Sequence, residues 1–408
     1  MSHPVDFDVI IVGGGPGGSA CARFLGEKGV SVLLLDKASF PRDKTCGDAV
    51  SGKSLKVLQE LGIKEKVAAK PNGKVKGVLL SAPNGKSFVV SMSKPGEVET
   101  NAYCVRREIL DNVLFEHATK VCQFRERVQV TGLLKEHSQV VGVKVKDLSL
   151  EKEQELRAHL VIGADGATSV VARELQVSQI PSEHNCVAVR GYYENVSGVT
   201  DNIELHFVDD LIPGYFWIFP LEGNMCNVGV GMVMQDMQQR KLNLVDEMKK
   251  ALEKEPFKSR FAHAKLHGDI KGWTLPFGSY KKKLVFDGAM LVGDAACLVD
   301  PFTGEGIGNA LTSGKLAAQQ ALLALEKKDF SQTFLQPYEA NVWKELGAEL
   351  DLSYQLQKYS KHKPLINFIF SRAQKNPKIA AALSEMLVNE TPREKTLSPL
   401  GLVKLLLS

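Results

Sequence analysis

Three glycines and an acid near the start of the chain have the types and spacing that bind phosphate and ribose. Gly13, Gly15 and Gly18 form a Gly-x-Gly-x-x-Gly turn. The first glycine permits a tight turn, the second lets a pyrophosphate approach the backbone, and the third lets a helix pack on the preceding strand. The amino terminus of that helix offers N–H groups and a positive dipole end to phosphates. Asp36 can accept hydrogen bonds from ribose hydroxyls and disfavours a 2′-phosphate, so the pattern suits FAD or NAD better than NADP.

The elements that must position these residues surround them in the sequence. Residues 9–12 are apolar and β-branched, which is typical of a strand buried on both faces. Residues 19–28 carry apolar side chains at helical spacing, and residues 30–35 form a second apolar strand that ends at Asp36. The order strand, glycine turn, helix, strand and acid predicts a dinucleotide-binding fold. A glycine turn in some other α/β protein is the alternative.

Later segments add both kinds of secondary structure. Residues 54–69 predict a helix, and residues 284–296 predict a strand that ends in Gly293-Asp294. Residues 75–92 alternate in polarity around an Asn-Gly turn, which favours a β-hairpin. Residues 186–234 are again β-rich, and the segment after residue 330 has apolar side chains at helical spacing.

Composition and charge exclude several classes of protein. The chain has 408 residues, of which 44% are hydrophobic and 24% charged, as expected of a globular protein with more than one packed unit. A net charge of +4 is too mild to indicate a nucleic-acid partner. The seven cysteines include no Cys-x-x-Cys pair, so we expect neither disulfides nor a metal site. No apolar run reaches the about 18 residues of a membrane span. The first strand begins within ten residues of Met1, so we expect no signal peptide and a cytoplasmic protein.

Two further stretches join the glycine turn in a recognisable combination. They are VIGADGATSVVAR at 161–173 and MLVGDAACLVDPFTGEGIGNAL at 290–311. Together the three resemble the FAD-dependent family of p-hydroxybenzoate hydroxylase, which includes aromatic monooxygenases, flavin halogenases and geranylgeranyl reductases. The resemblance covers roughly residues 5–330. It implies an α/β fold with a Rossmann-like FAD-binding domain, an inserted antiparallel β-sheet substrate domain and a helical C-terminal region.

The implied domains are discontinuous in the sequence. The expected FAD-binding domain comprises residues 1–70, 100–175 and 275–330, the β-rich substrate domain residues 71–99 and 176–274, and the helical region residues 331–408. The chain ends in a short apolar tail, Leu400 to Leu407. We expect this tail either to give weak, peripheral membrane contact or to pack on its own protein.

The resemblance also implies which residues hold non-covalent FAD. Asp165 and Gly166 match the second fingerprint near the pyrophosphate, and Asp294 matches an acid that hydrogen-bonds a ribityl hydroxyl. The Gly304–Ile307 loop would run beneath the isoalloxazine ring, and Arg107 matches an arginine near the cofactor. The full expected set is Gly13, Gly15, Pro16, Gly18, Asp36, Lys37, Lys44, Cys46, Gly47, Arg107, Asp165, Gly166, Asp294, Pro301, Gly304, Gly306 and Ile307.

Two stretches distinguish the subfamilies. Residues 41–47, PRDKTCG, resemble the PRxKxCG loop of the geranylgeranyl reductase group, and residues 215–220, YFWIFP, resemble its Tyr-x-Trp-x-Phe-Pro signature. Pro213 stands one residue closer to Tyr215 than in the archaeal lipid reductases. The same aromatic stretch is similar to the Gly-Trp-x-Trp-x-Ile-Pro segment of flavin halogenases, although Tyr215 replaces the first tryptophan.

The resemblance therefore implies a reductase of prenyl carbon–carbon double bonds, acting on a hydrophobic small molecule. Cys46, Tyr215 and Trp217 are the expected catalytic residues, with a buried, inert cysteine as the alternative for Cys46. Tyr215, Trp217 and Phe219 should line up on one face of a strand and bind the substrate. The alternative function is a flavin monooxygenase or halogenase that acts on an aromatic or polyketide-like substrate.

Several points stay open. The electron donor is NAD(P)H or ferredoxin, since no second Gly-x-Gly-x-x-Gly indicates a nicotinamide domain. The oligomeric state is unknown, and a monomer is compatible with the sequence. The sequence suggests no Ser-His-Asp arrangement, and His206, near the aromatic stretch, is interpreted as structural.

Overall fold

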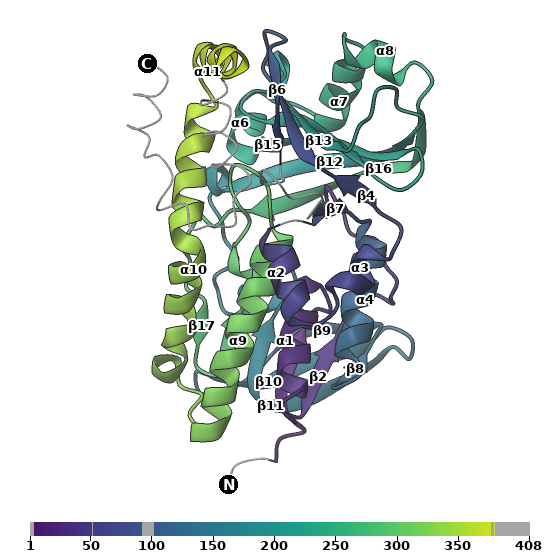
Figure 1. Cartoon of the computed structure of the whole chain (residues 1–408). Coiled ribbons are helices and arrows are strands. Elements are labelled where there is room, and N and C mark those ends of the chain that lie inside the picture. Colours follow the sequence, from purple (N-terminus) through teal and green to yellow (C-terminus); the bar gives the residue numbers. More distant parts are fainter. Residues whose placement is uncertain (1–3, 51, 92–101, 377–378, 380–408) are drawn as a thin grey trace.

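The computed structural model describes residues 4–50, 52–91, 102–376 and 379. In this part of the chain, two large sheets lie one above the other, and a small sheet of three strands accompanies them. The long helix α10 (Gln332–Tyr359) runs along one side of both layers (Figure 1). The architecture is the predicted α/β fold with an inserted, mainly antiparallel sheet and C-terminal helices.

The lower sheet in Figure 1 contains the predicted nucleotide-binding unit. Its path is β17-β18-β11-β1-β2-β8, with β10 and β9 continuing from β11. The central strand β1 pairs in parallel with β2 on one side and β11 on the other. The glycine turn that follows β1 therefore lies at a switch point, where open α/β sheets bind ligands. Val9, Ile10 and Ile11 have no exposed surface, which confirms that the strand is buried on both faces.

The strands of the lower sheet are β1 (Phe7–Val12), β2 (Val32–Leu35), β8 (Gln123–Arg125), β9 (Val128–Glu136), β10 (Gln139–Asp147), β11 (Lys152–Gly163), β17 (Val285–Phe286) and β18 (Ala289–Leu291). The small sheet consists of β3 (Ala49–Val50), β4 (Gly73–Val75) and β7 (Ala102–Cys104).

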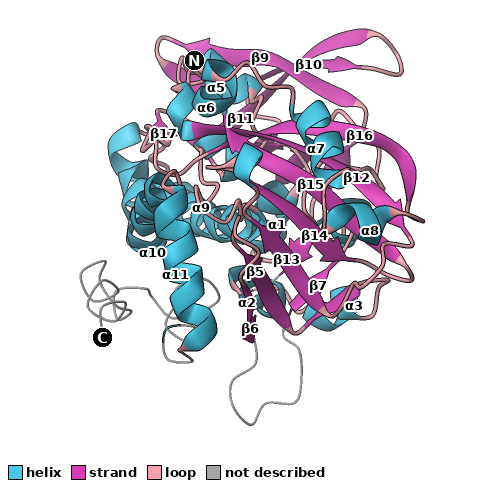
Figure 2. Cartoon of the chain, turned by 90° about the horizontal axis from the view of Figure 1, so that it is seen from above, coloured by secondary structure: helices cyan, strands magenta, loops and turns pink. Residues whose placement is uncertain are grey.

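The upper sheet has the order β16-β12-β15-β14-β13-β5-β6 within the described residues. Figure 2 shows its strands running side by side, with α11 near the end formed by β5 and β6. Its pairs are antiparallel except for β5 and β13, which run parallel. Its strands are β5 (Gly77–Ser81), β6 (Ser87–Ser91), β12 (Asn185–Glu194), β13 (Asn202–His206), β14 (Tyr215–Pro220), β15 (Met225–Val233) and β16 (Lys265–Pro276).

The remaining helices connect and cover the sheets. They are α1 (Pro16–Gly26), α2 (Lys53–Glu60), α3 (Lys64–Ala68), α4 (Arg107–Ala118), α5 (Val170–Glu174), α6 (Met234–Gln239), α7 (Leu244–Leu252), α8 (Phe257–Phe261), α9 (Ile307–Lys327) and α11 (Lys363–Lys375).

Two predicted elements are wrong in extent. The helix expected over 54–69 is divided into α2 and α3, because Gly62 adopts a left-handed backbone conformation with φ +68° that ends the first helix. The strand expected over 284–296 is divided by a turn at Gly288, whose φ is +74°. Its end, Gly293–Ala296, forms a short 3₁₀ helix.

The predicted membrane contact through Leu400 to Leu407 lies outside the described residues. Of the helices that the structure describes, none combines the length and the apolar character needed to cross a membrane.

Candidate cofactor and substrate site

A cavity of about 1150 Å³ is lined by residues of both large sheets and of helices α2, α9 and α10. Among the predicted site residues, Gly18 is the one that does not line it. The volume exceeds the about 300–1,000 Å³ that is usual for one small ligand. The cavity therefore has room for a cofactor and a second molecule.

The glycine turn forms one wall of this cavity. Gly13 has φ +105°, and a Cβ there would clash with the Ala164 backbone. A Cβ on Gly18 would clash with the Gly13 carbonyl oxygen, because α1 packs directly on the turn. At Gly15 a Cβ would meet only an Arg42 nitrogen, at 3.7 Å, so this glycine leaves open space above its backbone. That space lies in the cavity, in front of the amino terminus of α1.

Asp36 stabilises the turn from the end of β2. Its carboxylate accepts hydrogen bonds from the Gly14 N–H at 2.8 Å and from the Ala38 N–H at 2.8 Å. The side chain still borders the cavity next to Lys37, where a ribose would lie. The acid thus holds the phosphate turn in shape and borders the expected ribose position.

The carboxylate of Asp165 is hydrogen-bonded to groups within the protein. Its carboxylate accepts from the Ser169 hydroxyl and from the Val170 and Val171 N–H groups, which caps α5. Burial raises the pKa of Asp165, although these hydrogen bonds oppose the shift. The backbone of Asp165 and Gly166 lines the cavity and is the part of this fingerprint left to contact a ligand.

Asp294 and the loop 301–307 form a further part of the cavity wall. Asp294 pairs with Lys44 at 3.4 Å across the cavity lining. Gly304 has φ +74°, and Ile307 begins α9, so the amino terminus of this helix points at the cavity. Asp300, which was not predicted, fixes the loop: it accepts from the N–H groups of Phe302 and Thr303.

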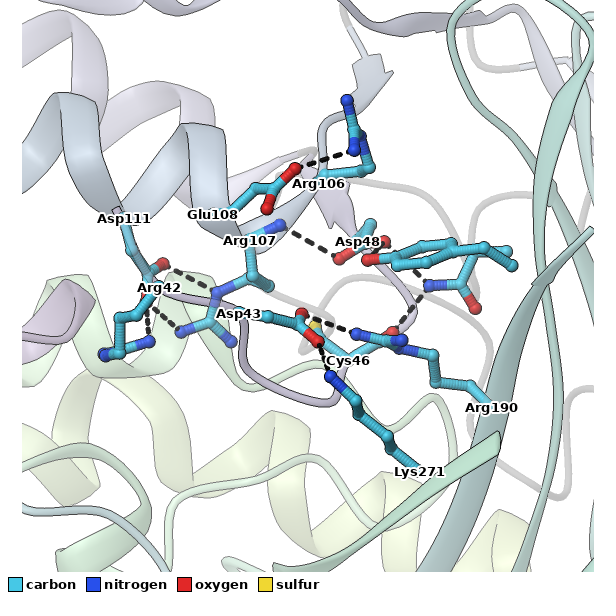
Figure 3. Close-up of polar contacts among 12 residues, drawn as sticks. Arg42, Asp43, Cys46, Asp48, Arg106, Arg107, Glu108, Asp111, Arg190 and Lys271 are labelled. Atoms are coloured by element: carbon cyan, nitrogen blue, oxygen red, sulfur yellow. Dashed lines mark hydrogen bonds and ion pairs between the residues drawn. The ribbon is translucent and has the colours of Figure 1, made fainter. Parts of the chain in front are cut away.

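The loop 41–48 carries the predicted Lys44, Cys46 and Gly47 between the two sheets, and Figure 3 shows its polar contacts. Arg42 reaches Asp111 at 2.9 Å, and Arg107 holds the same carboxylate with two hydrogen bonds of 2.7 Å. Although burial opposes ionisation, Arg107 and Arg42 hold the pKa of Asp111 below its usual value. Burial likewise disfavours charged Arg107, but Asp111 and Cys46 raise its pKa above the usual range.

The upper sheet holds the same loop from the other side. Asp43 pairs with Arg190 at 2.6 Å and with Lys271 at 2.8 Å. Although burial opposes it, these two cations keep the pKa of Asp43 low. Asp48, at the end of the loop, accepts hydrogen bonds from Tyr192 and Asn227. Residues 42–48 are thus fixed by side chains of both layers (Figure 3).

The aromatic strand β14 presents alternate side chains to opposite faces. Tyr215, Trp217 and Phe219 line the cavity together, whereas Phe216 and Ile218 pack in a core cluster behind the sheet. The Tyr215 hydroxyl donates to the Thr303 carbonyl at 2.8 Å, and burial raises its pKa.

Trp217 is tied into the site by its polar atom. The Trp217 indole N–H donates to Asn227 at 2.9 Å. Both polar groups of the aromatic face, the Tyr215 hydroxyl and this N–H, therefore have partners within the protein. What the three side chains offer a ligand is apolar and aromatic surface.

His206 belongs to an arrangement that the sequence analysis did not expect. Its Nδ1 lies 2.6 Å from the Ser81 hydroxyl, and its Nε2 lies 2.8 Å from Glu204. The parallel pairing of β5 and β13 aligns Ser81 with His206 across 125 positions of sequence, and the acid is a glutamate, so this is not a Ser-His-Asp arrangement. Arg260 also holds Glu204, with hydrogen bonds of 2.6 and 2.8 Å. Among the described residues that line the cavity, none belongs to this chain of contacts.

Sequence reasoning missed Asp48, Tyr192, Arg190 and Asn227. They come from a loop and two strands, and only the folded sheet brings them together. The one signal available was an acid directly after Cys46-Gly47 in a loop already expected at the cofactor.

Known protein families show the class of protein to which the chain belongs. Residues 6–342 match the protein family described as FAD binding domain. The chain is an FAD-dependent oxidoreductase of the p-hydroxybenzoate hydroxylase-like type.

Within that class the chain belongs to the geranylgeranyl reductase family. It is 33% identical to digeranylgeranylglycerophospholipid reductase of Methanosarcina mazei over 85% of this chain and 83% of that protein. A solved structure of a geranylgeranyl bacteriochlorophyll reductase-like protein from Thermoplasma acidophilum has 25% identity and a TM-score of 0.85, covering 98% of both chains. A flavin-dependent brominase, at 22% identity, a TM-score of 0.80 and 98% coverage of both chains, shares the fold.

The residues of the cavity fit FAD. Open space above Gly15 at the start of α1 suits a pyrophosphate, Asp36 borders the ribose position, and Asp294 lines the same cavity beside Lys44. The amino terminus of α9 faces the cavity at Gly306 and Ile307, where its N–H groups and dipole would stabilise negative charge on a flavin.

Proposed function

We propose that the protein reduces carbon–carbon double bonds of a prenyl chain of the geranylgeranyl type. The observation that carries the proposal is that one cavity joins the FAD-binding wall to the aromatic face of Tyr215, Trp217 and Phe219. The names of the relatives support the same substrate class, since the Methanosarcina protein is a digeranylgeranylglycerophospholipid reductase.

The residues of the cavity have distinct roles in this reaction. Reduced FAD, when bound, would supply the hydride that one alkene carbon receives. The aromatic face binds the apolar chain, at about 0.8 kcal/mol for each buried CH₂ group, and excludes water. The Cys46 thiol, which borders the cavity, gives a proton to the other alkene carbon and regains it from solvent. Tyr215 acts through its ring, because its hydroxyl donates to Thr303.

An anaerobic assay tests the proposal. Photoreduced holoprotein is mixed with geranylgeranyl lipids and, in parallel, with aromatic acids, and products are read by mass. A gain of two hydrogens per double bond without oxygen supports the reductase. Turnover of an aromatic acid that consumes oxygen in step with product would contradict it and indicate a monooxygenase or halogenase.

The electron donor is part of the proposal. NAD(P)H that binds transiently, or a ferredoxin, reduces the flavin. Bleaching of the flavin absorbance by each donor under anaerobic conditions measures which one serves, and oxidised flavin in the presence of both would exclude them.

We also assign a peripheral membrane contact to α11. Leu365 and Phe368 on this helix are 36% and 42% exposed. Residues 358–375 contain five lysines and arginines and no acid, although Lys361 and Lys363 pair with acids of other elements. An exposed apolar face with flanking cations suits an anionic lipid surface.

Vesicle flotation tests this contact. The double variant Leu365→Ser/Phe368→Ser should float less with anionic vesicles than the wild type. Leu323→Ser, which changes another leucine that is 50% exposed, is the control. Equal flotation of the double variant and the wild type would exclude α11, and a truncation after Ser398 then tests the tail.

A further inference from the structure

We propose that Asp48 is a positioning residue for the reduction: its ionised carboxylate fixes the main chain of Cys46 and Gly47 against the aromatic face of β14. The role rests on the proposed function, because Cys46 is the residue expected beside the reacting atoms. Asp48 borders the cavity but has no exposed surface, so its partners are protein groups.

The backbone at Asp48 is itself unusual. Its φ is +70°, a left-handed conformation that is uncommon for any residue other than glycine. Such conformations persist where the surrounding structure over-determines them, and they gather at functional sites. At Asp48 the surrounding structure is a set of hydrogen bonds from three different elements.

Three donors converge on the two carboxylate oxygens. Oδ2 accepts from the Tyr192 hydroxyl at 2.9 Å and from the Asn227 amide at 2.8 Å. Oδ1 accepts from the main-chain N–H of Arg107 at 3.3 Å. A protonated acid would place its O–H against one of these donors and lose that contact. The ionised form is therefore the one that satisfies the whole arrangement.

Asn227 carries the constraint from Asp48 to the site. It has no exposed surface, and the same amide group that donates to Asp48 also donates to the Cys46 carbonyl at 2.6 Å. Its oxygen accepts from the Trp217 indole at 2.9 Å. One side chain thus fixes the Cys46 main chain relative to the aromatic face.

Gly47 shows how close the loop and β14 lie. A Cβ there would come within 3.0 Å of the Phe219 ring. A small shift of the loop would therefore change the shape of the cavity beside both Cys46 and Phe219. Misplacement by about 1 Å can lower a rate about 100-fold.

The electrostatic surroundings bring the protonation of Asp48 into an accessible pH range. Burial raises the pKa of Asp48 to about 6, although the hydrogen bonds from Asn227 and Tyr192 and the charge of Arg190 oppose the shift. The titratable and charged groups that face it are Arg107 from α4, Arg190 and Tyr192 from β12, and Cys104 from β7.

Tyr192→Phe and Tyr193→Phe form a matched pair. The first removes one donor to Asp48, whereas Tyr193 packs on the other face of β12 against Phe261. In the holoenzyme we expect turnover of a geranylgeranyl lipid to fall on the acid side, with a midpoint near the pKa of Asp48. Tyr192→Phe should raise the midpoint of this acid-side fall in turnover by about one pH unit, because it removes one hydrogen bond to the ionised form of Asp48. Tyr193→Phe should leave this midpoint unchanged. Equal pH profiles of turnover for the two variants would overturn the proposal.

A second readout does not depend on turnover. The chain has three tryptophans, so their indole N–H resonances are simple to assign in the FAD-loaded protein. The Trp217 resonance should titrate near pH 6, the value of Asp48, through Asn227. The midpoint should rise in Tyr192→Phe, and Trp343 serves as the internal control. A Trp217 resonance that does not titrate would overturn the proposal, even if the protein reduces prenyl lipids.

Asp48→Asn completes the test. Asparagine tolerates the left-handed backbone, so the variant should fold and keep its FAD. We expect turnover about 10- to 100-fold lower, without an acid limb, and no Trp217 titration near pH 6. Wild-type turnover in this variant would overturn the role. If the wild type reduces no prenyl lipid, the proposed function fails, and the Trp217 titration still decides whether Asp48 controls the aromatic face.

Discussion

Gly15 and Gly18 stand in the same turn, yet a side chain would meet different surroundings at each. At Gly18 a Cβ would clash with the Gly13 carbonyl, whereas at Gly15 it would enter open cavity. Gly15 also has an ordinary backbone conformation, with φ −70°. Gly18 therefore permits the close packing of α1 on the turn, and Gly15 leaves room for the approach of a ligand.

We expect Gly15→Ala to fold normally and to bind FAD at least about tenfold more weakly, a loss of about 1.4 kcal/mol or more. Gly18→Ala should lower the melting temperature of the apoprotein itself. Thermal unfolding of apoprotein and flavin titration separate the two effects. Unchanged FAD affinity in Gly15→Ala would contradict the position assigned to the pyrophosphate.

A second prediction concerns Asp48 and the pH dependence of the unfolding free energy. Its pKa is raised on folding, from 3.8 to about 6. An acid with a raised pKa favours the fold most below its unfolded pKa, and that contribution is lost as pH rises through about 4 to 6. Asp48→Asn lacks this titration. The unfolding free energy of the variant relative to wild type should therefore increase by about 2 kcal/mol between pH 4 and pH 7. Denaturant melts at both pH values measure it, and a constant difference would contradict the raised pKa.

The side chains of β14 alternate between the cavity and the core. Its cavity face carries Tyr215, Trp217 and Phe219, and its other face carries Phe216 and Ile218 in the core. Neighbouring positions on one strand should thus respond differently to substitution.

Trp217→Leu should lower kcat/KM for a prenyl lipid by about tenfold, or about 1.4 kcal/mol, with normal FAD content. Phe216→Leu should keep kcat/KM and lose about 1–3 kcal/mol of unfolding free energy. Steady-state kinetics and denaturant melts give both numbers. If Trp217→Leu loses stability but not activity, the substrate lies elsewhere.

Helix α10 holds the start of the loop 301–307 in place. Ser353 donates to Asp300 at 2.7 Å, and Gln357 donates to the Pro301 carbonyl at 2.7 Å. Near the other end of α10, Gln320 of α9 donates to the Phe334 carbonyl at the same distance. Each glutamine amide donates to a main-chain carbonyl, but of the two only Gln357 contacts the loop 301–307.

Gln357→Ala should therefore weaken FAD binding about fivefold or more, consistent with about 1 kcal/mol for one lost hydrogen bond. Gln320→Ala should reduce thermal stability and leave the FAD affinity unchanged. Flavin fluorescence on titration measures the affinity. Equal affinities in the two variants would show that α10 does not hold the loop.

The sequence predicts those parts of this molecule that are local. The turn at Gly13–Gly18, the alternation of β14 and the hairpin of β5 and β6 each follow from neighbouring residues, and the structure confirms these elements. The roles of the individual site residues stay predictions. The arrangement around Asp48 was not predictable, because Tyr192 and Asn227 become its partners only through the pairing of β12 with β15. Gly62 and Gly288 divided predicted elements for a different reason: a left-handed glycine leaves little trace in apolar periodicity.

The parallel pairing of β5 with β13 has a consequence for biosynthesis. The hairpin at 77–91 emerges from the ribosome more than a hundred residues before residue 202, where its partner strand begins. At translation rates of about 5–20 residues per second, one edge of β5 stays unpaired for on the order of ten seconds. Exposed strand edges promote association between chains. Nascent chains of this protein are thus expected to depend on chaperones during that interval, and slower translation of residues 92–201 should lower the soluble yield.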